Sequence, residues 1–298
     1  MHFKQVQLVI NFIRRKIDSL IYMDNEDFEL AAVKDKFNEN CDYVHVKKNS
    51  FYDAYMNNDS LLCHKWEQYM HIYNKHLQPF KSENKPVNIL EIGVFKGGSL
   101  ELWNRYLPEN SKIIGIDINP DCKNIEFHNK NIQVFTGSAS DKNFVEENFK
   151  NHYFDIIIDD GSHISSDVIT AFEAFFPKLN PGGLYIIEDL HTSYWSSYGG
   201  DFLSKKSSIE YLKRLIDSLN FKYIQKFKKN LPLDYIRQLS TLNKELASIT
   251  FYDSVCILEK YMCKKSRAFK NYLSGEGAAD SDLGMLCNKD TKFERFFR

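Results

Sequence analysis

The chain has 298 residues, with 39 basic and 40 acidic side chains, a formal net charge of −1 and 43% hydrophobic residues. The charge balance argues against a nucleic-acid binder that relies on a basic face, and the hydrophobic content is enough for a sizeable core. Six cysteines without a C-x-x-C pair are typical of reduced, scattered thiols, which favours a cytoplasmic protein.

Residues 1–85 are predicted to form a helical N-terminal extension. Apolar residues over 6–21 share one helical stripe that a basic triplet closes, a pattern unlike a signal peptide or a spanning helix. We expect a docking helix that forms a homo-oligomer, with no stable membrane insertion; a membrane-surface helix is the alternative. A second helix is predicted over 61–77, ended by Pro79 and Pro86.

From residue 87 the pattern changes to apolar strands that alternate with helices. The predicted strands cover 87–92, 112–117, 132–136, 154–159 and 184–188, and the predicted helices cover 99–106, 142–150 and 165–179. Continuous apolar strands of this kind form a parallel sheet with helices on both faces. Ligands of such a sheet bind at the carboxyl ends of its strands.

The C-terminal third is less regular. A helix is predicted at about 207–219, residues 221–247 receive no assignment, and 248–252 with 255–260 form a tight hairpin. We therefore predict a doubly wound, Rossmann-like α/β domain over 86–260, mostly parallel and closed by an antiparallel hairpin. Residues 261–298 are predicted to be a tail.

The first predicted strand leads into a glycine-rich turn, E-I-G-V-F-K-G-G-S over 91–99. Glycines before a helix allow a ligand to approach the backbone, and Asp117, at the end of the next strand, can accept hydrogen bonds from ribose hydroxyls. The G-x-G-x-x-G pattern of dinucleotide sites is missing, and Glu91 suits a cationic ligand. The turn thus favours S-adenosylmethionine, with an ordinary tight turn as the alternative.

Carboxylates gather where the fourth and fifth predicted strands end. Asp160, Glu188 and Asp189 should converge at one edge of the sheet, with no matching cluster of Lys or Arg. A divalent cation with oxygen ligands, Mg²⁺, would neutralise them. His163 is placed to take a proton beside that metal, although a structural histidine is the alternative. Asp159 could equally serve as a strand-end carboxylate that caps backbone N–H groups.

The stretch from about 65 to 260 resembles the class I S-adenosylmethionine-dependent O-methyltransferases of the bacterial sugar group, also called macrolide-sugar or cephalosporin-hydroxylase-like. The matching motifs are KWEQYMHIYNKHLQPF, NILEIGVFKGGSLELW, GIDINPDCK, FDIIIDDGSH, PGGLYIIEDLHTSYW and ITFYDSVCILEK. The resemblance implies metal-dependent methyl transfer from S-adenosylmethionine to a sugar hydroxyl.

The resemblance also implies residue roles. It matches His163 to the general base, with Asp160 beside it, and Asp160, Glu188 and Asp189 to the Mg²⁺ ligands. The positions expected to contact the cofactor are Glu91, Gly93, Gly97, Ser99, Asp117, Ser138 and Asp159. His191, Tyr194 and Trp195 are expected beside the acceptor, and the segment with Lys65, Trp66 and Tyr69 is expected to fold over the cofactor.

Two positions depart from the family pattern. Relatives commonly carry Gly-Asp-Gln near the adenine, whereas this chain has Gly-Ser-Ala at 137–139, and Thr250 replaces a common histidine. Neither change touches the metal cluster, so activity is expected.

The acceptor is expected to be a small molecule or glycan with vicinal hydroxyls, on a surface polysaccharide, a nucleotide-sugar or a glycosylated metabolite. No nucleic-acid partner is expected. Three alternatives are an O-methyltransferase of a small aromatic diol, an NAD-dependent oxidoreductase or epimerase, and an inactive accessory subunit.

Overall fold

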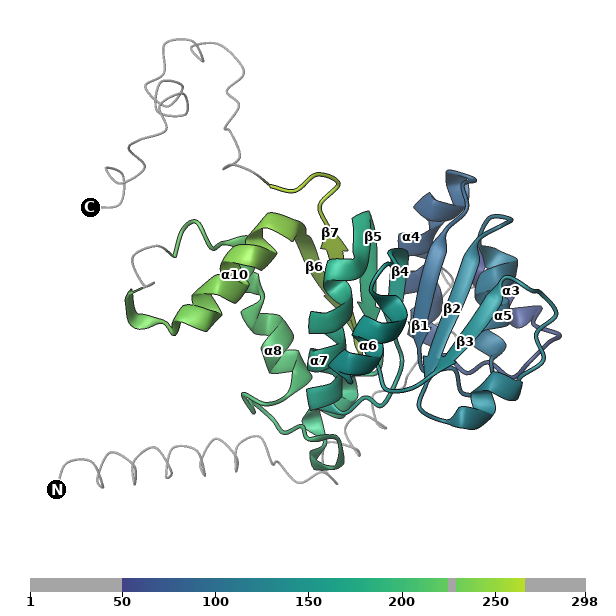
Figure 1. Cartoon of the computed structure of the whole chain (residues 1–298), viewed down its shortest axis with the longest axis horizontal. Coiled ribbons are helices and arrows are strands. Elements are labelled where there is room, and N and C mark those ends of the chain that lie inside the picture. The colour runs from purple at the N-terminus through teal and green to yellow at the C-terminus, as the bar shows by residue number, and fades with distance from the viewer. Residues whose placement is uncertain (1–49, 225–228, 266–298) are drawn as a thin grey trace, which may run out of the picture. The chain divides into compact units, whose positions relative to one another are not determined.

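The computed structural model describes residues 50–224 and 229–265 (Figure 1). Their seven strands form one sheet in the order β3-β2-β1-β4-β5-β7-β6. The strands are β1 Asn88–Ile92, β2 Lys112–Asp117, β3 Ile132–Thr136, β4 Phe154–Asp159, β5 Leu179–Ile187, β6 Leu246–Tyr252 and β7 Val255–Lys260. β1 to β5 pair in parallel, and β7 pairs antiparallel with both β5 and β6. The Rossmann-like prediction is confirmed.

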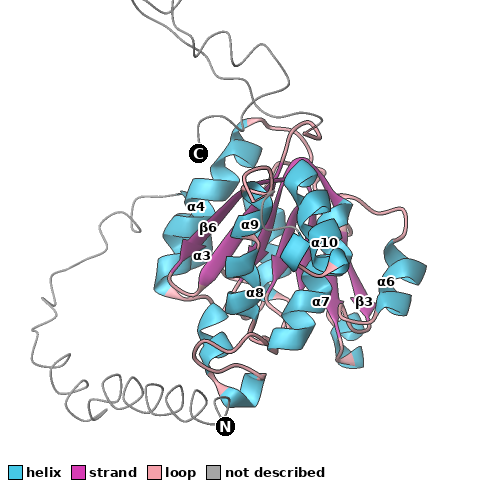
Figure 2. Cartoon of the chain, turned by 90° about the vertical axis from the view of Figure 1, so that its left-hand side faces the viewer, coloured by secondary structure: helices cyan, strands magenta, loops and turns pink. Residues whose placement is uncertain are grey.

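The helices cover both faces of the sheet, with α3 and α4 on one side and α6, α7 and α10 on the other (Figure 2). The α-helices are α3 Ser50–Met56, α4 Glu67–Ser82, α5 Gly98–Tyr106, α6 Lys142–Phe149, α7 Ser165–Phe175, α8 Ser208–Arg214, α9 Ile216–Leu219 and α10 Leu233–Glu245. The centre of β4 is apolar because both faces of the strand are covered: Ile156, Ile157 and Ile158 are fully buried. Among the described residues we find no helix long and apolar enough to cross a bilayer.

Four predicted boundaries were wrong. The helix predicted over 61–77 begins only at Glu67. α4 runs through Pro79 to Ser82, because the carbonyl of Pro79 still accepts the N–H of Glu83 and the last turn closes without the missing proline donor. The predicted helix 165–179 ends at Phe175 and continues as a 3₁₀ turn over 176–178. β5 starts at Leu179, before the Asn-Pro-Gly-Gly stretch, because a register shift against β4 accommodates those residues as a bulge.

Three other parts of the chain complete the comparison between the predicted and the observed elements. Residues 221–247, which received no assignment, contain α10. The predicted helix over 6–21 and the tail beyond residue 265 lie outside the described residues.

The ends of the central strands are tied together by backbone hydrogen bonds. Gly93 donates to the carbonyl of Ile116, Asp160 donates to Ile92, and Glu188 donates to Asp159, at 2.8, 2.9 and 3.0 Å. These bonds extend the ladder one residue beyond each strand. The loops that follow β1, β4 and β5 therefore start from fixed positions at a single edge of the sheet.

Candidate active site

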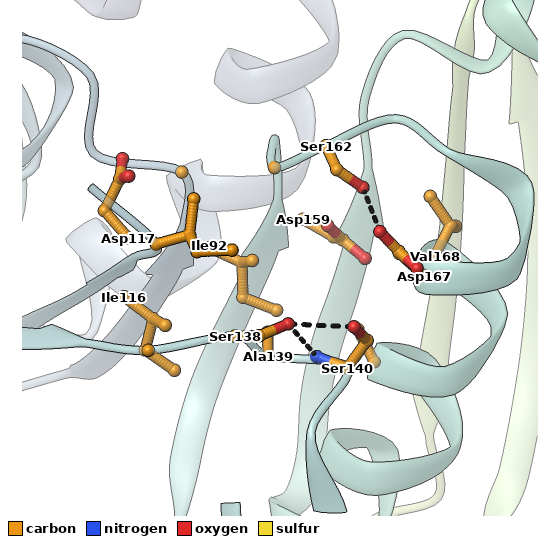
Figure 3. Close-up of a pocket in the computed structure, with 15 residues that line it drawn as sticks. Ile92, Ile116, Asp117, Ser138, Ala139, Ser140, Asp159, Ser162, Asp167 and Val168 are labelled. Carbon is orange, nitrogen blue, oxygen red and sulfur yellow. Dashed lines mark hydrogen bonds between the residues drawn. The ribbon is translucent and has the colours of Figure 1, made fainter. Parts of the chain in front are cut away.

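Two cavities lie at the carboxyl edge of the sheet and share Gly93, Asp117 and Gly161 in their walls. The larger has a volume of about 820 Å³ and reaches Lys65, Ser99, Asp160, His163, Glu188 and Asp189. The smaller, about 190 Å³, lies against α7 and the loop after β3 (Figure 3). An elongated ligand could thus extend from one cavity into the other past the glycine loop.

Gly93 is required by its surroundings. Its φ is +95°, and a Cβ there would lie 2.1 Å from the carbonyl oxygen of Asp160, so no other residue fits without moving the loop. Asp117 holds the next residues: its Oδ2 accepts the N–H groups of Val94 and Phe95 at 2.8 and 3.1 Å. The carboxylate that was predicted to bind ribose therefore also caps the glycine loop.

The smaller cavity combines an apolar wall with a few hydroxyl and carboxylate groups. Ile92, Ile116 and Val168 contribute the wall (Figure 3). The Ser138 hydroxyl lies 2.9 Å from that of Ser140, and burial raises the pKa of Asp159 to about 7. Ser138 and Asp159 thus line a recess of the mixed character typical of small-molecule sites.

Asp160 and Asp189, two of the three predicted metal ligands, come together with His163, the predicted base; Glu188, the third predicted ligand, is not part of this group. One ligand atom from each lies within 4.8 Å of the other two, and His163 Nε2 is 3.9 Å from Asp160 Oδ1 and 3.6 Å from Asp189 Oδ2. His163 and Asp189 both have a positive φ, +56° and +53°. Such strained backbone conformations in non-glycine residues cluster at functional sites.

The expectation that no cation matches the carboxylates was wrong. Lys65 Nζ lies 2.6 Å from Asp160, 2.7 Å from Glu188 and 3.6 Å from Glu91, and its side chain is 1% exposed. Burial lowers the pKa of Lys65, but the carboxylates of Asp160 and Glu188 outweigh it and raise that pKa well above its usual range. Lys65 is therefore a buried ammonium in the cluster.

Three aromatic side chains of the same segment also contact the carboxylates. Tyr73 donates to Glu188 Oε1, while Trp66 Nε1 and the Tyr69 hydroxyl donate to Asp189 Oδ1 at 3.1 and 2.6 Å. Burial raises the pKa of Glu188 to about 8. Sequence reasoning missed these contacts, although the signal was visible: Tyr69 and Tyr73 are four residues apart and so share one face of a helix.

Glu91 and Gly97 were predicted to contact the cofactor. Neither is among the described residues that line the two cavities. Glu91 is fully buried and accepts hydrogen bonds from Ser99 and Trp103 at 2.7 and 3.0 Å. Its Oε1 has no hydrogen-bond partner among the described residues. Ser99, in contrast, lines the larger cavity.

The three predicted acceptor residues lie after β5, outside both cavity walls in the described part of the chain. His191 Nδ1 is 2.6 Å from the Ser254 hydroxyl of the β6–β7 turn. Its ring is nearly perpendicular to the rings of Trp66 and Trp195, and the ring centroids lie 5.9 and 4.9 Å apart. Tyr194 and Trp195 are about half exposed, at 47% and 50%.

Comparison with known proteins identifies the domain. Residues 90–190 match a family described as a methyltransferase domain. The chain is 34% identical over 199 residues to mycinamicin VI 2''-O-methyltransferase of Micromonospora griseorubida, a match that covers 63% of this chain and 47% of the relative. It is 35% identical over 199 residues to demethylmacrocin O-methyltransferase of Streptomyces fradiae, with the same coverage.

Solved structures agree. MycE methyltransferase in complex with Mg, SAH and mycinamycin VI superposes with a TM-score of 0.60 and 29% identity, over 74% of this chain and 55% of that one. The chain spans about half the length of the curated relatives it matches.

The fold and the family match thus define a methyltransferase domain of the class I, Rossmann-like type. Over about half of their length, bacterial sugar O-methyltransferases are similar to this chain, in agreement with the resemblance found in the sequence.

Proposed function

We propose that this protein transfers a methyl group from S-adenosylmethionine to a sugar hydroxyl of a glycosylated metabolite, with Mg²⁺ as a second cofactor. One observation carries the proposal. Two neighbouring cavities that share three wall residues, and are large enough together for a nucleoside cofactor, lie beside the cluster of Asp160, His163 and Asp189. The cofactor and the acceptor can therefore meet at the residues that would do the chemistry.

The cavities fit S-adenosylmethionine. Asp117 lines both cavities, where it would lie beside the ribose; its Oδ2 holds the loop and its Oδ1 accepts the Asn119 N–H at 2.8 Å. The smaller cavity, with Ser138 and Asp159, would take the base. The larger cavity, with Ser99 and Asp160, would take the methionine portion, whose ammonium and sulfonium suit an acidic wall.

The donor set fits Mg²⁺. Oxygen atoms of carboxylates are its preferred protein ligands, and Asp160, Glu188 and Asp189 would hold it at the edge of the larger cavity. When bound, Mg²⁺ would supply positive charge that stabilises the acceptor oxygen as its proton leaves.

His163 would accept that proton. Its Nε2 faces Asp160 and Asp189, and the carboxylates stabilise the imidazolium that forms. The acceptor oxygen then attacks the methyl carbon, the carbon–sulfur bond breaks, and the electron pair of that bond remains on sulfur in S-adenosylhomocysteine. Fixing both reactants at near-attack distance supplies much of the acceleration.

The named relatives guide the choice of acceptor. Their names place methyl transfer on mycinamicin VI, on demethylmacrocin and on a rhamnosyl tetracenomycin. This favours a glycosylated metabolite over a surface polysaccharide or a nucleotide-sugar. His191, Tyr194 and Trp195 would face the acceptor from the loop after β5, where half-exposed aromatic rings offer an apolar surface.

Two measurements on the full chain test the proposal. Calorimetry should detect micromolar binding of S-adenosylhomocysteine, and labelled methyl transfer should mark glycosylated metabolites that carry vicinal hydroxyls. Failure to bind S-adenosylhomocysteine would contradict the proposal and favour an inactive subunit. Transfer to catechols alone would contradict the sugar acceptor and favour the aromatic diol.

A further inference from the structure

The segment of residues 65–73, which leads into α4 and includes its first two turns, holds one oxygen of each predicted metal-binding carboxylate. Lys65 Nζ donates to Asp160 Oδ2 at 2.6 Å and to Glu188 Oε1 at 2.7 Å, and Tyr73 donates to the same Glu188 oxygen. Tyr69 donates to Asp189 Oδ1 at 2.6 Å. These donors come from a segment 95 to 123 residues away along the chain from the carboxylates they meet.

The opposite oxygens of two of these carboxylates face the proton acceptor. Asp160 Oδ1 and Asp189 Oδ2 are the atoms nearest His163 Nε2, at 3.9 and 3.6 Å. Lys65 and Tyr69 therefore divide each of these two groups into an oxygen that is fixed and an oxygen that remains available. That division is what orients a carboxylate toward a bound ion.

The donors themselves are rigidly placed. Lys65 is 1% exposed at its side chain, and Tyr69 and Tyr73 are 0% and 1% exposed. A buried ammonium is stable only where charges of opposite sign surround it, so Lys65 and the carboxylates depend on each other. Tyr69 also accepts the N–H of Asp189 at 3.0 Å, which ties the backbone at its positive φ to α4.

We propose that residues 65–73 form an orienting segment for the metal site: Lys65 and Tyr69 are positioning residues that fix Asp160, Glu188 and Asp189 for Mg²⁺, and Lys65 balances part of their charge. The inference rests on the proposed function. It assigns to α4, which lies outside the β–α units of the sheet, a role in binding the cation.

Tyr69→Phe is the sharper test, because it removes one hydroxyl and keeps the ring. With S-adenosylhomocysteine bound, calorimetry should show Mg²⁺ affinity lower by about 10-fold or more, the range typical when a group that orients a metal ligand is lost. The affinity for S-adenosylhomocysteine should change less than threefold. Tyr153→Phe is the matched control, since that ring is 56% exposed; its Mg²⁺ affinity should equal that of the wild type.

Lys65→Met tests the charge balance by thermal unfolding with chelator or with Mg²⁺. In chelator the melting temperature should fall by about 10 °C, because buried carboxylates lose their counter-charge. Mg²⁺ should raise it more in the variant than in the wild type, since the ion then supplies the missing positive charge. Lys85→Met, which removes an ammonium that is 77% exposed, should behave like the wild type.

The outcomes separate the two proposals. A wild type that binds neither S-adenosylhomocysteine nor Mg²⁺ contradicts the proposed function. A wild type that binds both, with Mg²⁺ affinity unchanged within twofold in Tyr69→Phe, overturns the orienting segment alone. Equal Mg²⁺-dependent melting shifts in Lys65→Met and the wild type would overturn the charge balance, and if Lys65→Met fails to fold, Tyr69→Phe decides.

Discussion

The part of the site proposed for the cofactor (the cofactor half) and the part proposed for Mg²⁺ (the cation half) are held together by different kinds of contact. In the cofactor half, after β1 and β2, the contacts involve mainly the backbone. Gly93 lets its backbone approach the carbonyl of Asp160, and Asp117 accepts the N–H groups of Val94 and Phe95. In the cation half, after β4 and β5, buried side chains dominate, and Lys65 places one ammonium among three carboxylates.

This difference has a physical consequence. The hydrogen bonds of Asp117 in the cofactor half span 23 and 22 residues, whereas those of Lys65 in the cation half span 95 and 123. Buried charges in the cation half stabilise one another across long separations, and removal of one leaves the others unpaired. The two halves should therefore respond separately to perturbation, except where they touch.

Removal of the metal ion with a chelator should give the largest difference between the responses of the two halves. Excess EDTA should abolish methyl transfer, because the acceptor oxygen loses its stabilising charge, and added Mg²⁺ should restore it. Binding of S-adenosylhomocysteine, measured by calorimetry in EDTA, should change less than threefold. Full activity in chelator would exclude the metal, and loss of cofactor binding would show that the halves are not separate.

Removal of the proposed base should act on the cation half alone. His163→Ala should lower kcat by about 10³-fold, within the range for loss of a general base, with S-adenosylhomocysteine affinity unchanged. Steady-state kinetics and calorimetry on the same preparation check both. A variant with weak cofactor binding would contradict a role restricted to proton transfer.

Gly93→Ala should damage both halves, because the added Cβ meets the Asp160 carbonyl 2.1 Å away. We expect a loss of about 2–4 kcal/mol in the free energy of unfolding, measured in urea, together with loss of cofactor binding. Gly199→Ala is the control: its φ is +68°, but nothing lies within 4 Å of the new Cβ. It should cost about 1 kcal/mol and leave cofactor binding intact.

The smallest effect concerns how α4 is anchored. His76 Nε2 lies 2.8 Å from the Tyr252 hydroxyl, and burial lowers the pKa of His76 to about 4. The unfolded chain, with a pKa near 6.5, binds more protons between pH 4 and 6.5. The stability contributed by neutral His76 is therefore present above about pH 6.5 and is lost as the pH falls toward 4.

Urea unfolding at pH 7 and pH 5 measures this contribution of His76 to the free energy of unfolding. Since the ring is partly exposed to solvent, the wild type should lose about 1 kcal/mol more than His76→Gln between these two pH values. Equal losses in both proteins would show that His76 does not titrate in this way.

The sequence predicted the fold well because the signals for it are local. The apolar runs at β1, β2, β3 and β4 match the observed strands to within a residue, and the Asp253-Ser254 turn is where the hairpin closes. β5 was harder, since its start depends on a register shift against β4 that no local pattern reveals.

Within the site, the sequence placed Asp160, His163 and Asp189 at one edge, because parallel strands must end together. It did not predict the partners of Glu91, a fully buried carboxylate that accepts hydrogen bonds from Ser99 and Trp103 of α5. Whether a polar group at a strand end faces ligand or core depends on the helix that packs over it.

The class of this protein could be predicted from the sequence by itself. The glycine turn, the acid at the end of the next strand and the two carboxylate-rich strand ends can be recognised from chain order, because the topology of a parallel sheet brings them to one edge. Tertiary structure alone decided the charge balance of the site. Lys65 becomes the counter-ion of Asp160 and Glu188 only because the segment before α4 reaches the residues that follow β4 and β5. Electrostatic pairing depends on distance in space, and 95 and 123 residues of intervening chain hide that distance from any local pattern.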